Sequence, residues 1–184
     1  MSDDLNAVQD AVAAERRAAK TIELGAHRYA LIVSVVLWIA YLLLPYAGEA
    51  HGWEALMLGT TSEGVKISLV EAISAWLALV GVGVLTTATI VTRRTALALV
   101  AWMMTTVSFF ANLWGFWYRH SAADGAEIGM YVGALSTFIA FIVYCQVALR
   151  RSPEQLAAAE RVREVSGQLD HVGVLQSEAA TDVP

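Results

Sequence analysis

Two long apolar runs face each other across the adjacent pair Arg93 and Arg94, in the stretch from Ile67 to Trp117. A helix of about 20 mostly apolar residues is long enough to cross the hydrocarbon core of a bilayer. The whole chain is 57% hydrophobic and only 16% charged, and a single soluble domain could not hide that much apolar surface. We therefore predict a polytopic membrane protein.

The apolar residues gather in four windows, which sets the predicted fold class. We expect an all-α protein with four transmembrane helices in an up-down bundle, joined on the outer side by a loop over 47–66. The expected spans are 29–46, 67–91, 96–117 and 127–149.

Basic residues are distributed unequally between the ends of these spans, and loops rich in Lys and Arg stay on the cytoplasmic side. Lys66 and Arg119 stand near the outer ends, whereas all other basic residues stand at the inner ends or in the terminal segments. We therefore expect both termini in the cytoplasm. The excess of Arg over Lys, with abundant Ala and Val, suggests a bacterial plasma membrane.

The two terminal segments are expected to form cytoplasmic helices. Residues 1–28 show apolar positions at helical spacing, and residues 150–184 begin with Ser152 as an N-cap and Pro153 at the first helical position. The last residues of the chain are polar and small. The N-terminal stripe is narrow and rich in Ala, which favours contact with protein over contact with lipid.

Small residues recur at helical spacing on several of the expected helices and predict close helix packing. We expect the second and third spans to pack face to face, and the glycines of the fourth span to dock on the first span or on another chain. The expected interface residues are Ala78, Gly81, Thr105, Gly115, Gly125, Gly129 and Gly133.

Glu71 is the most informative polar residue, since an ionisable side chain within a span is costly and usually has a partner. A structural clasp with Asn112, Ser74 or Ser108 is the favoured interpretation, ahead of ligand or partner binding and of proton or ion movement. If Arg119 folds onto Glu71, the carboxylate should stay ionised. The residues proposed for ligand or partner binding are Glu71, Ser74, Ser108, Asn112, Arg119 and His120.

No catalytic or metal-binding pattern is visible, so we predict no enzyme activity, cofactor or metal. Cys145 is the single cysteine, and a packing role suits it better than redox chemistry. His51 and Glu54 are three residues apart, but two ligands without a third are weak grounds for a metal site. The net charge of −5 offers no basic surface overall, so we predict no nucleic acid partner.

Together these patterns predict a non-catalytic accessory or assembly subunit of a larger bacterial membrane complex, such as a transporter or envelope machine. Its partners would be membrane lipid and other membrane protein subunits, and a homo-oligomer is possible. The alternative is a small transporter, or a membrane protein that binds lipid or a small molecule, with an outward-facing pocket around Glu71 and Asn112.

Overall fold

The structure is a computed structural model, which describes residues 9, 12–14, 16–17, 19–61, 64–121, 125–149, 156–157, 159–160 and 162–163. The chain divides into two compact units, one formed by Met1–Ile22 with Arg151–Pro184 and the other by Glu23–Arg150. In the first unit the described residues include helical pieces, whereas Ser152 and Pro153 lie outside the described residues. The second unit is the helical domain discussed below.

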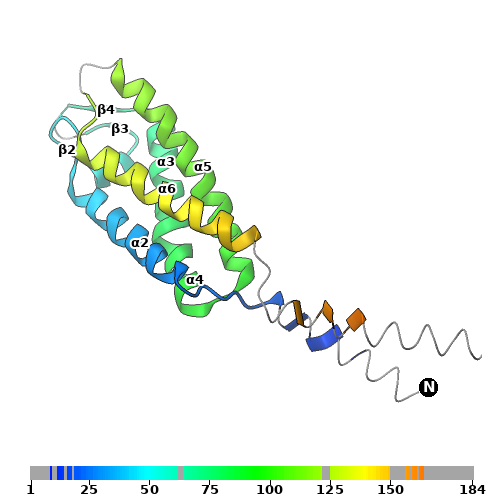
Figure 1. Cartoon of the computed structure of the whole chain (residues 1–184). Coiled ribbons are helices and arrows are strands. Elements are labelled where there is room, and N and C mark those ends of the chain that lie inside the picture. The colour runs from blue at the N-terminus through cyan, green and yellow to red at the C-terminus, as the bar shows by residue number, and fades with distance from the viewer. Residues whose placement is uncertain are drawn as a thin grey trace, which may run out of the picture. The chain divides into compact units, whose positions relative to one another are not determined.

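Four helical stretches form this domain, and consecutive stretches run in opposite directions (Figure 1). The second stretch is continuous but changes its hydrogen-bonding pattern in the middle, where a π-helix, η2, joins two α-helices. The stretches are α2 (His27–Leu43), α3–η2–α4 (Leu69–Ala78, Leu79–Thr86 and Thr87–Thr92), α5 (Thr95–His120) and α6 (Ile128–Leu149).

The helix ends follow from local sequence. Leu44 is extended, with ψ 154°, because the proline at position 45 disfavours a helical residue before it, and α2 ends there. Ser68 is the N-cap of α3: its hydroxyl accepts a hydrogen bond from the Glu71 amide, while the Glu71 carboxylate accepts one from the Ser68 amide. At the other end of this stretch Arg93 adopts a left-handed conformation, with φ 53°, and terminates α4.

The π-helix lies where two glycines allow close approach between helices. A Cβ atom on Gly81 would lie 3.0 Å from the Cβ of Met104, and one on Gly83 would lie 2.9 Å from the Trp38 ring. The Thr86 hydroxyl donates a hydrogen bond of 2.8 Å to the Gly81 carbonyl five residues earlier. Short π-helical segments inside α-helices are frequent at functional sites.

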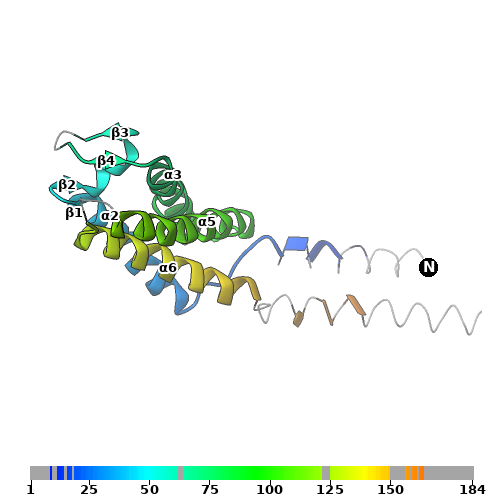
Figure 2. The same cartoon turned by 90° about the horizontal axis from the view of Figure 1, so that it is seen from above.

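The four stretches contact one another in a ring. Contacts join α2 to α6, α6 to α5, and α5 to α3 and η2, and the ring closes where η2 and α4 meet α2 (Figures 1 and 2). On α6, a Cβ atom on Gly129 would lie 2.6 Å from the Pro45 carbonyl oxygen, and one on Gly133 would lie 2.8 Å from the Tyr41 ring. The side chains of Ser34 and Ser136 also donate to each other's carbonyl groups at 2.8 Å. Two of the expected interface glycines therefore lie against the end of α2.

The loop between α2 and α3 folds into a small cap over one end of the bundle. It contains two short antiparallel hairpins and one turn of 3-10 helix. The domain therefore contains strands, whereas an all-α domain was expected. The elements are β1 (Pro45–Ala47), β2 (Ala50–His51), η1 (Gly52–Leu56), β3 (Gly59–Thr60) and β4 (Lys66–Ile67). Strands of two or three residues are too short to show the alternating pattern that identifies a strand in sequence.

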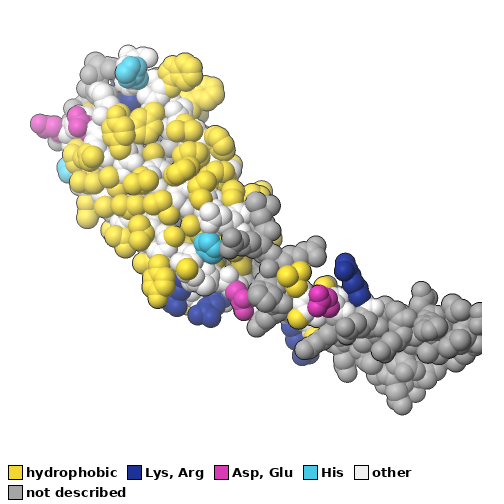
Figure 3. All heavy atoms as spheres, in the orientation of Figure 1, with side chains coloured by type: hydrophobic (Ala, Val, Ile, Leu, Met, Phe, Trp, Pro, Cys, Tyr) yellow, Lys and Arg dark blue, Asp and Glu magenta, His cyan; other side chains and the backbone are white. Residues whose placement is uncertain are grey.

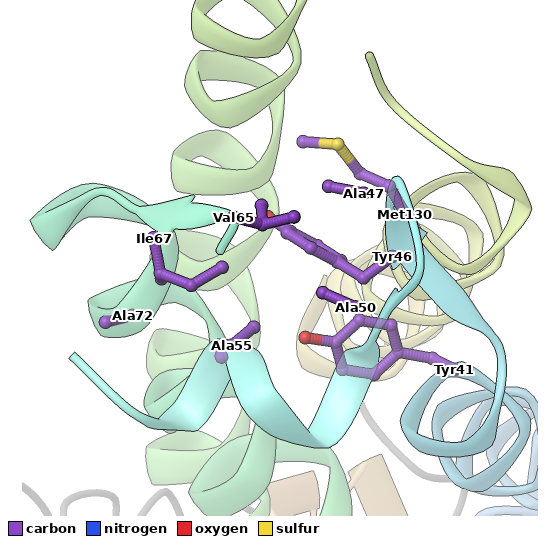
Figure 4. Packing of buried hydrophobic residues seen from close by; sticks show 10 residues of the cluster. Tyr41, Tyr46, Ala47, Ala50, Ala55, Val65, Ile67, Ala72 and Met130 are labelled. Carbon is purple, nitrogen blue, oxygen red and sulfur yellow. The ribbon is translucent and has the colours of Figure 1, made fainter. Parts of the chain in front are cut away.

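The cap has its own buried core, in which Tyr41 and Tyr46 lie side by side (Figure 4). Their ring centroids are 6.0 Å apart and the planes cross at 74°, the edge-to-face geometry that aromatic pairs prefer. Val65 of the cap and Met130 of α6 complete this core beside Tyr46 (Figure 4). The core therefore fixes the cap to both α2 and α6.

Among the residues that the structure describes, three helical stretches are long and apolar enough to cross a membrane when judged by length and composition alone. They are Leu69–Thr92, Thr95–His120 and Ile128–Val147, whereas the apolar helix His27–Leu43 is shorter. Many of their large apolar side chains are exposed, and hydrophobic side chains cover most of the face of the bundle in Figure 3.

Candidate functional site

Glu71 stands in the first turn of α3 and is 2% exposed. One carboxylate oxygen, Oε2, accepts hydrogen bonds from the Ser68 amide at 2.8 Å and from the Ser68 hydroxyl at 2.7 Å. A carboxylate in the first turn of a helix is also favoured by the positive end of the helix dipole. The helix start therefore holds the carboxylate in one orientation.

Arg119, in the last turn of α5, is 1% exposed and points inward to this carboxylate. Its Nε lies 2.6 Å from Glu71 Oε1, and its Nη2 lies 3.3 Å from Glu71 Oε2. The same Nη2 donates to the Lys66 carbonyl of the cap at 2.8 Å. This two-point pairing of guanidinium and carboxylate is the strong and directional form of an ion pair.

Tyr46 of the cap completes the cluster from a third side. Its hydroxyl donates to Glu71 Oε1 at 3.1 Å, and the guanidinium carbon of Arg119 lies 5.7 Å from the centre of its ring. Burial, and then the nearby Glu71 carboxylate, raise the pKa of the Tyr46 phenol well above its usual value. Both causes penalise a second negative charge beside Glu71, so Tyr46 acts here as a hydrogen-bond donor.

This cluster joins the cap to α3 and α5 and is closed to solvent. Both partners of the ion pair are almost fully buried, and both carboxylate oxygens accept hydrogen bonds. A buried ion pair of this kind is costly to disrupt because removal of one partner leaves the other charge unpaired. The arrangement suits a structural clamp better than a proton donor or acceptor.

The other predicted site residues lie elsewhere. Ser74 and Ser108 donate to each other's carbonyl groups, at 3.1 and 3.0 Å, and so join α3 to α5. Asn112 lies 3.5 Å from the Thr137 hydroxyl of α6, within hydrogen-bond distance, and not beside Glu71. His120 is exposed. Of the six predicted residues, the structure therefore brings together two separate pairs, Glu71 with Arg119 and Ser74 with Ser108.

Three contributors to the cluster were missed in the sequence: Tyr46, Ser68 and the Lys66 carbonyl. Ser68 carried a visible signal, because Ser followed three residues later by Glu is the pattern of a capping box at a helix start. Tyr46 was not among the residues predicted for the site. A carbonyl acceptor such as that of Lys66 has no sequence signal.

Within the described part of the chain, most of the predicted interface residues lie at contacts between helices, but Gly125 does not. Ala78 is buried, Gly81 packs on α5 near Thr105, and Gly115 lies between Met130 and Glu71. A Cβ atom added to Gly125 would meet no heavy atom of the described residues within 4 Å. Its surroundings differ from those of Gly129 and Gly133, which lie four and eight residues further along.

An open groove of about 740 Å³ runs over the end of α5, on the surface beside the cluster. Among the described residues, its lining is largely aromatic and includes no charged side chain. The lining residues are Phe110, Leu113, Trp114, Trp117, Tyr118 and Ser121. Within the part of the chain that the structure describes, no group of three His, Cys, Asp or Glu side chains is placed to hold a metal ion.

Comparison with known proteins decides the family. Residues 8–164 match the MiaB C-terminal domain family. The chain belongs to this family. A curated relative, the tRNA-2-methylthio-N(6)-dimethylallyladenosine synthase of Mycobacterium avium (strain 104), is 34% identical over 151 residues. These residues are 79% of the chain and 21% of the relative, so the chain spans about a fifth of the length of the synthase that it matches. No solved structure matches the chain.

Membership of the MiaB C-terminal domain family overturns the predicted fold class and function. The polytopic membrane bundle is replaced by a helical MiaB C-terminal domain, and neither the accessory subunit of a membrane complex nor the alternative small transporter is retained. The prediction that the chain is not an enzyme is also overturned, because its relative is a synthase. Length and hydropathy report only whether a helix could cross a bilayer, so these criteria do not identify a family.

The same match overturns the predicted partners and location. The sequence predicted membrane lipid and membrane protein subunits as partners, no nucleic acid partner, and a multi-pass location in the bacterial plasma membrane. A match to a tRNA-modifying synthase contradicts each of these predictions. The predictions rested on apolar content and net charge, and both quantities are averages over the chain.

Proposed function

We propose that this chain acts in the modification of tRNA, as a domain of a synthase that makes 2-methylthio-N6-dimethylallyladenosine. The observation that carries the proposal is the family match over residues 8–164, supported by 34% identity to a synthase of that name. Because the chain spans about a fifth of that relative, the rest of the synthase would supply the parts that this domain lacks.

The geometry of the domain favours a binding or positioning role within the enzyme. The cluster around Glu71 is closed to solvent, and the Glu71 carboxylate is already held by Arg119, Tyr46 and Ser68. A carboxylate with this many partners is not free to take a proton from a substrate. The domain would instead present a rigid surface to tRNA or to the rest of the synthase.

Removal of the coding segment for this chain tests the proposal. Total tRNA is digested to nucleosides, and the methylthiolated and unmethylthiolated forms of N6-dimethylallyladenosine are quantified by mass spectrometry. The proposal predicts that the methylthiolated nucleoside falls and its precursor accumulates, and that a plasmid copy of the chain restores the ratio. An unchanged ratio after removal contradicts the proposal.

A further inference from the structure

Basic side chains gather at the end of the helical domain that lies opposite the cap. Arg28 stands in the first turn of α2, and Arg93 and Arg94 form the turn between α4 and α5. All three are exposed or partly exposed, and the contact between α2 and α4 brings their elements together. Basic side chains are visible at this end of the domain in Figure 3. We call these three residues the arginine end.

The arginine end lacks neutralising partners. Among the residues that the structure describes, Arg28, Arg93 and Arg94 form no ion pair, whereas Arg119 is paired with Glu71. The closest acidic residue along the chain is Glu23, which precedes α2. Among the described residues, the exposed charges at the cap end are Glu49, Glu127 and Lys66, so that end has no excess of basic side chains. The domain is therefore electrostatically polarised, although the chain as a whole carries a net charge of −5.

The backbone of the turn adds to this polarity. Arg93 is left-handed, with φ 53° and ψ 31°, and Arg94 is extended, with φ −85° and ψ 126°. The first turn of α5 follows directly, and the side chain of its N-cap residue, Arg94, makes no capping hydrogen bond. Free amides at a helix start favour a negative group. The two arginines and the start of α5 thus favour an anion at the same place.

We propose that the arginine end binds the phosphate backbone of tRNA, a role that rests on the proposed function. Arginine binds phosphate through two parallel hydrogen bonds and keeps its charge at all physiological pH values. Contacts with phosphate provide affinity without reading sequence, and they position a protein on its nucleic acid. The described residues that line the groove on α5 include no basic side chain, so they do not provide this attraction.

Titration of fluorescent tRNA with the full chain tests the proposal. The chain is kept in mild detergent because many large apolar side chains are exposed. Replacement of both arginines, Arg93→Gln with Arg94→Gln, should weaken binding ~10-fold and reduce the slope of log K against log salt by about 2. The matched pair Arg93→Lys with Arg94→Lys keeps both charges, so it should keep the wild-type salt slope and bind more tightly than the Gln pair. Equal affinity and equal slope for the Gln pair would overturn the proposal.

Arg93→Gly separates binding from folding. Glycine adopts the left-handed conformation without a steric penalty, so this variant should unfold at a temperature no lower than the wild type. Its affinity for tRNA should nevertheless fall, because one phosphate contact is lost. Unchanged affinity in this folded variant would count against the arginine end.

A parallel titration uses vesicles with and without phosphatidylglycerol, which also presents phosphate groups. Binding to tRNA that depends on the arginines supports the proposal. Binding to the anionic vesicles that depends on the arginines, with no binding to tRNA, overturns it in favour of a lipid surface.

The nucleoside ratio distinguishes failure of this inference from failure of the proposed function. If removal of the chain lowers the methylthiolated nucleoside but the Gln pair restores it fully, the domain acts in modification through another surface. If removal leaves the ratio unchanged, the proposed function itself fails.

Discussion

At the scale of single residues, the domain depends on one buried ion pair. Glu71 and Arg119 are 48 positions apart in the sequence and belong to different helices, yet they meet at 2.6 Å with almost no exposure. Desolvation of two charges is costly, and only good geometry with further hydrogen bonds offsets it. Tyr46, Ser68 and the Lys66 carbonyl provide these hydrogen bonds.

Replacement of Arg119 by Met should therefore destabilise the domain by about 3–5 kcal/mol, because Glu71 would remain buried without its cation. The double variant, Glu71→Gln with Arg119→Met, removes both charges and should cost less than Arg119→Met alone. Chemical unfolding of the full chain, followed by circular dichroism, measures the free energy of unfolding of the single and the double variant. A double variant that is less stable than the single variant would contradict a clamp in which each charge balances the other.

The raised pKa of the Tyr46 phenol predicts an alkaline limit to stability. The unfolded chain releases a tyrosine proton near pH 10, whereas the folded domain retains it to higher pH. The folded state thus binds more protons above about pH 10, and the free energy of unfolding should fall there as pH rises.

Tyr46→Phe tests this limit, because the variant keeps the ring and loses the titrating group. Unfolding measurements between about pH 8 and pH 11, which bracket the pKa of a free tyrosine, should show a shallower fall for Tyr46→Phe than for the wild type. Parallel curves for the two proteins would show that Tyr46 does not contribute to the alkaline limit.

The sequence made the pairing of Glu71 with Arg119 conceivable but could not select it. Glu71 was recognisable as an acidic residue that needs a partner, and Arg119 was one of several candidates. Asn112, another candidate, lies beside Thr137 instead. The choice depends on how far α5 extends and which way its last turn faces, and these properties are set by packing.

At the scale of elements, α6 packs closely against the end of α2 because Gly129 and Gly133 carry no side chain at the contact. The space at Gly129 is bounded by the backbone carbonyls of Leu44 and Pro45, which cannot move aside as a side chain can. Close approach of two elements at such a position needs glycine. The aromatic ring of Tyr41 fills the corresponding space at Gly133.

Gly129→Ala should destabilise the domain by about 1–3 kcal/mol, as overpacking at a tight contact does. Gly125→Ala is the matched control, since a Cβ atom at Gly125 meets no described neighbour within 4 Å. Thermal unfolding of both variants measures the difference. Equal melting temperatures for the two variants would contradict a tight contact between α6 and the end of α2.

Helices were the predictable elements, and the cap was not. Long apolar runs mark the helical stretches, although α2 ends at Leu43 while the expected span reached residue 46. Within the segment predicted only as a loop over 47–66, one turn of 3-10 helix is present over Gly52–Leu56, with Ala55 buried. The π-helix over Leu79–Thr86 has no established sequence signature beyond its glycines.

At the scale of the whole molecule, net charge and apolar content led to wrong predictions of partners and function. A net charge of −5 was interpreted as excluding nucleic acid, but the described charges are separated, with arginines at one end of the helical domain and exposed carboxylates among the charges at the other. High apolar content was interpreted as defining a membrane subunit, and the family match overturns that interpretation. Composition and net charge are averages over all residues, so they neither locate charges on the surface nor identify a family.

The ratio of methylthiolated to unmethylthiolated N6-dimethylallyladenosine in total tRNA tests the central claim most directly. It is measured in cells that lack this chain and in the same cells complemented with wild type, Gly125→Ala or Gly129→Leu. The proposed function predicts that wild type and Gly125→Ala restore the ratio, and that Gly129→Leu, whose side chain cannot fit against Pro45, does not. The same ratio in all of these strains would contradict it.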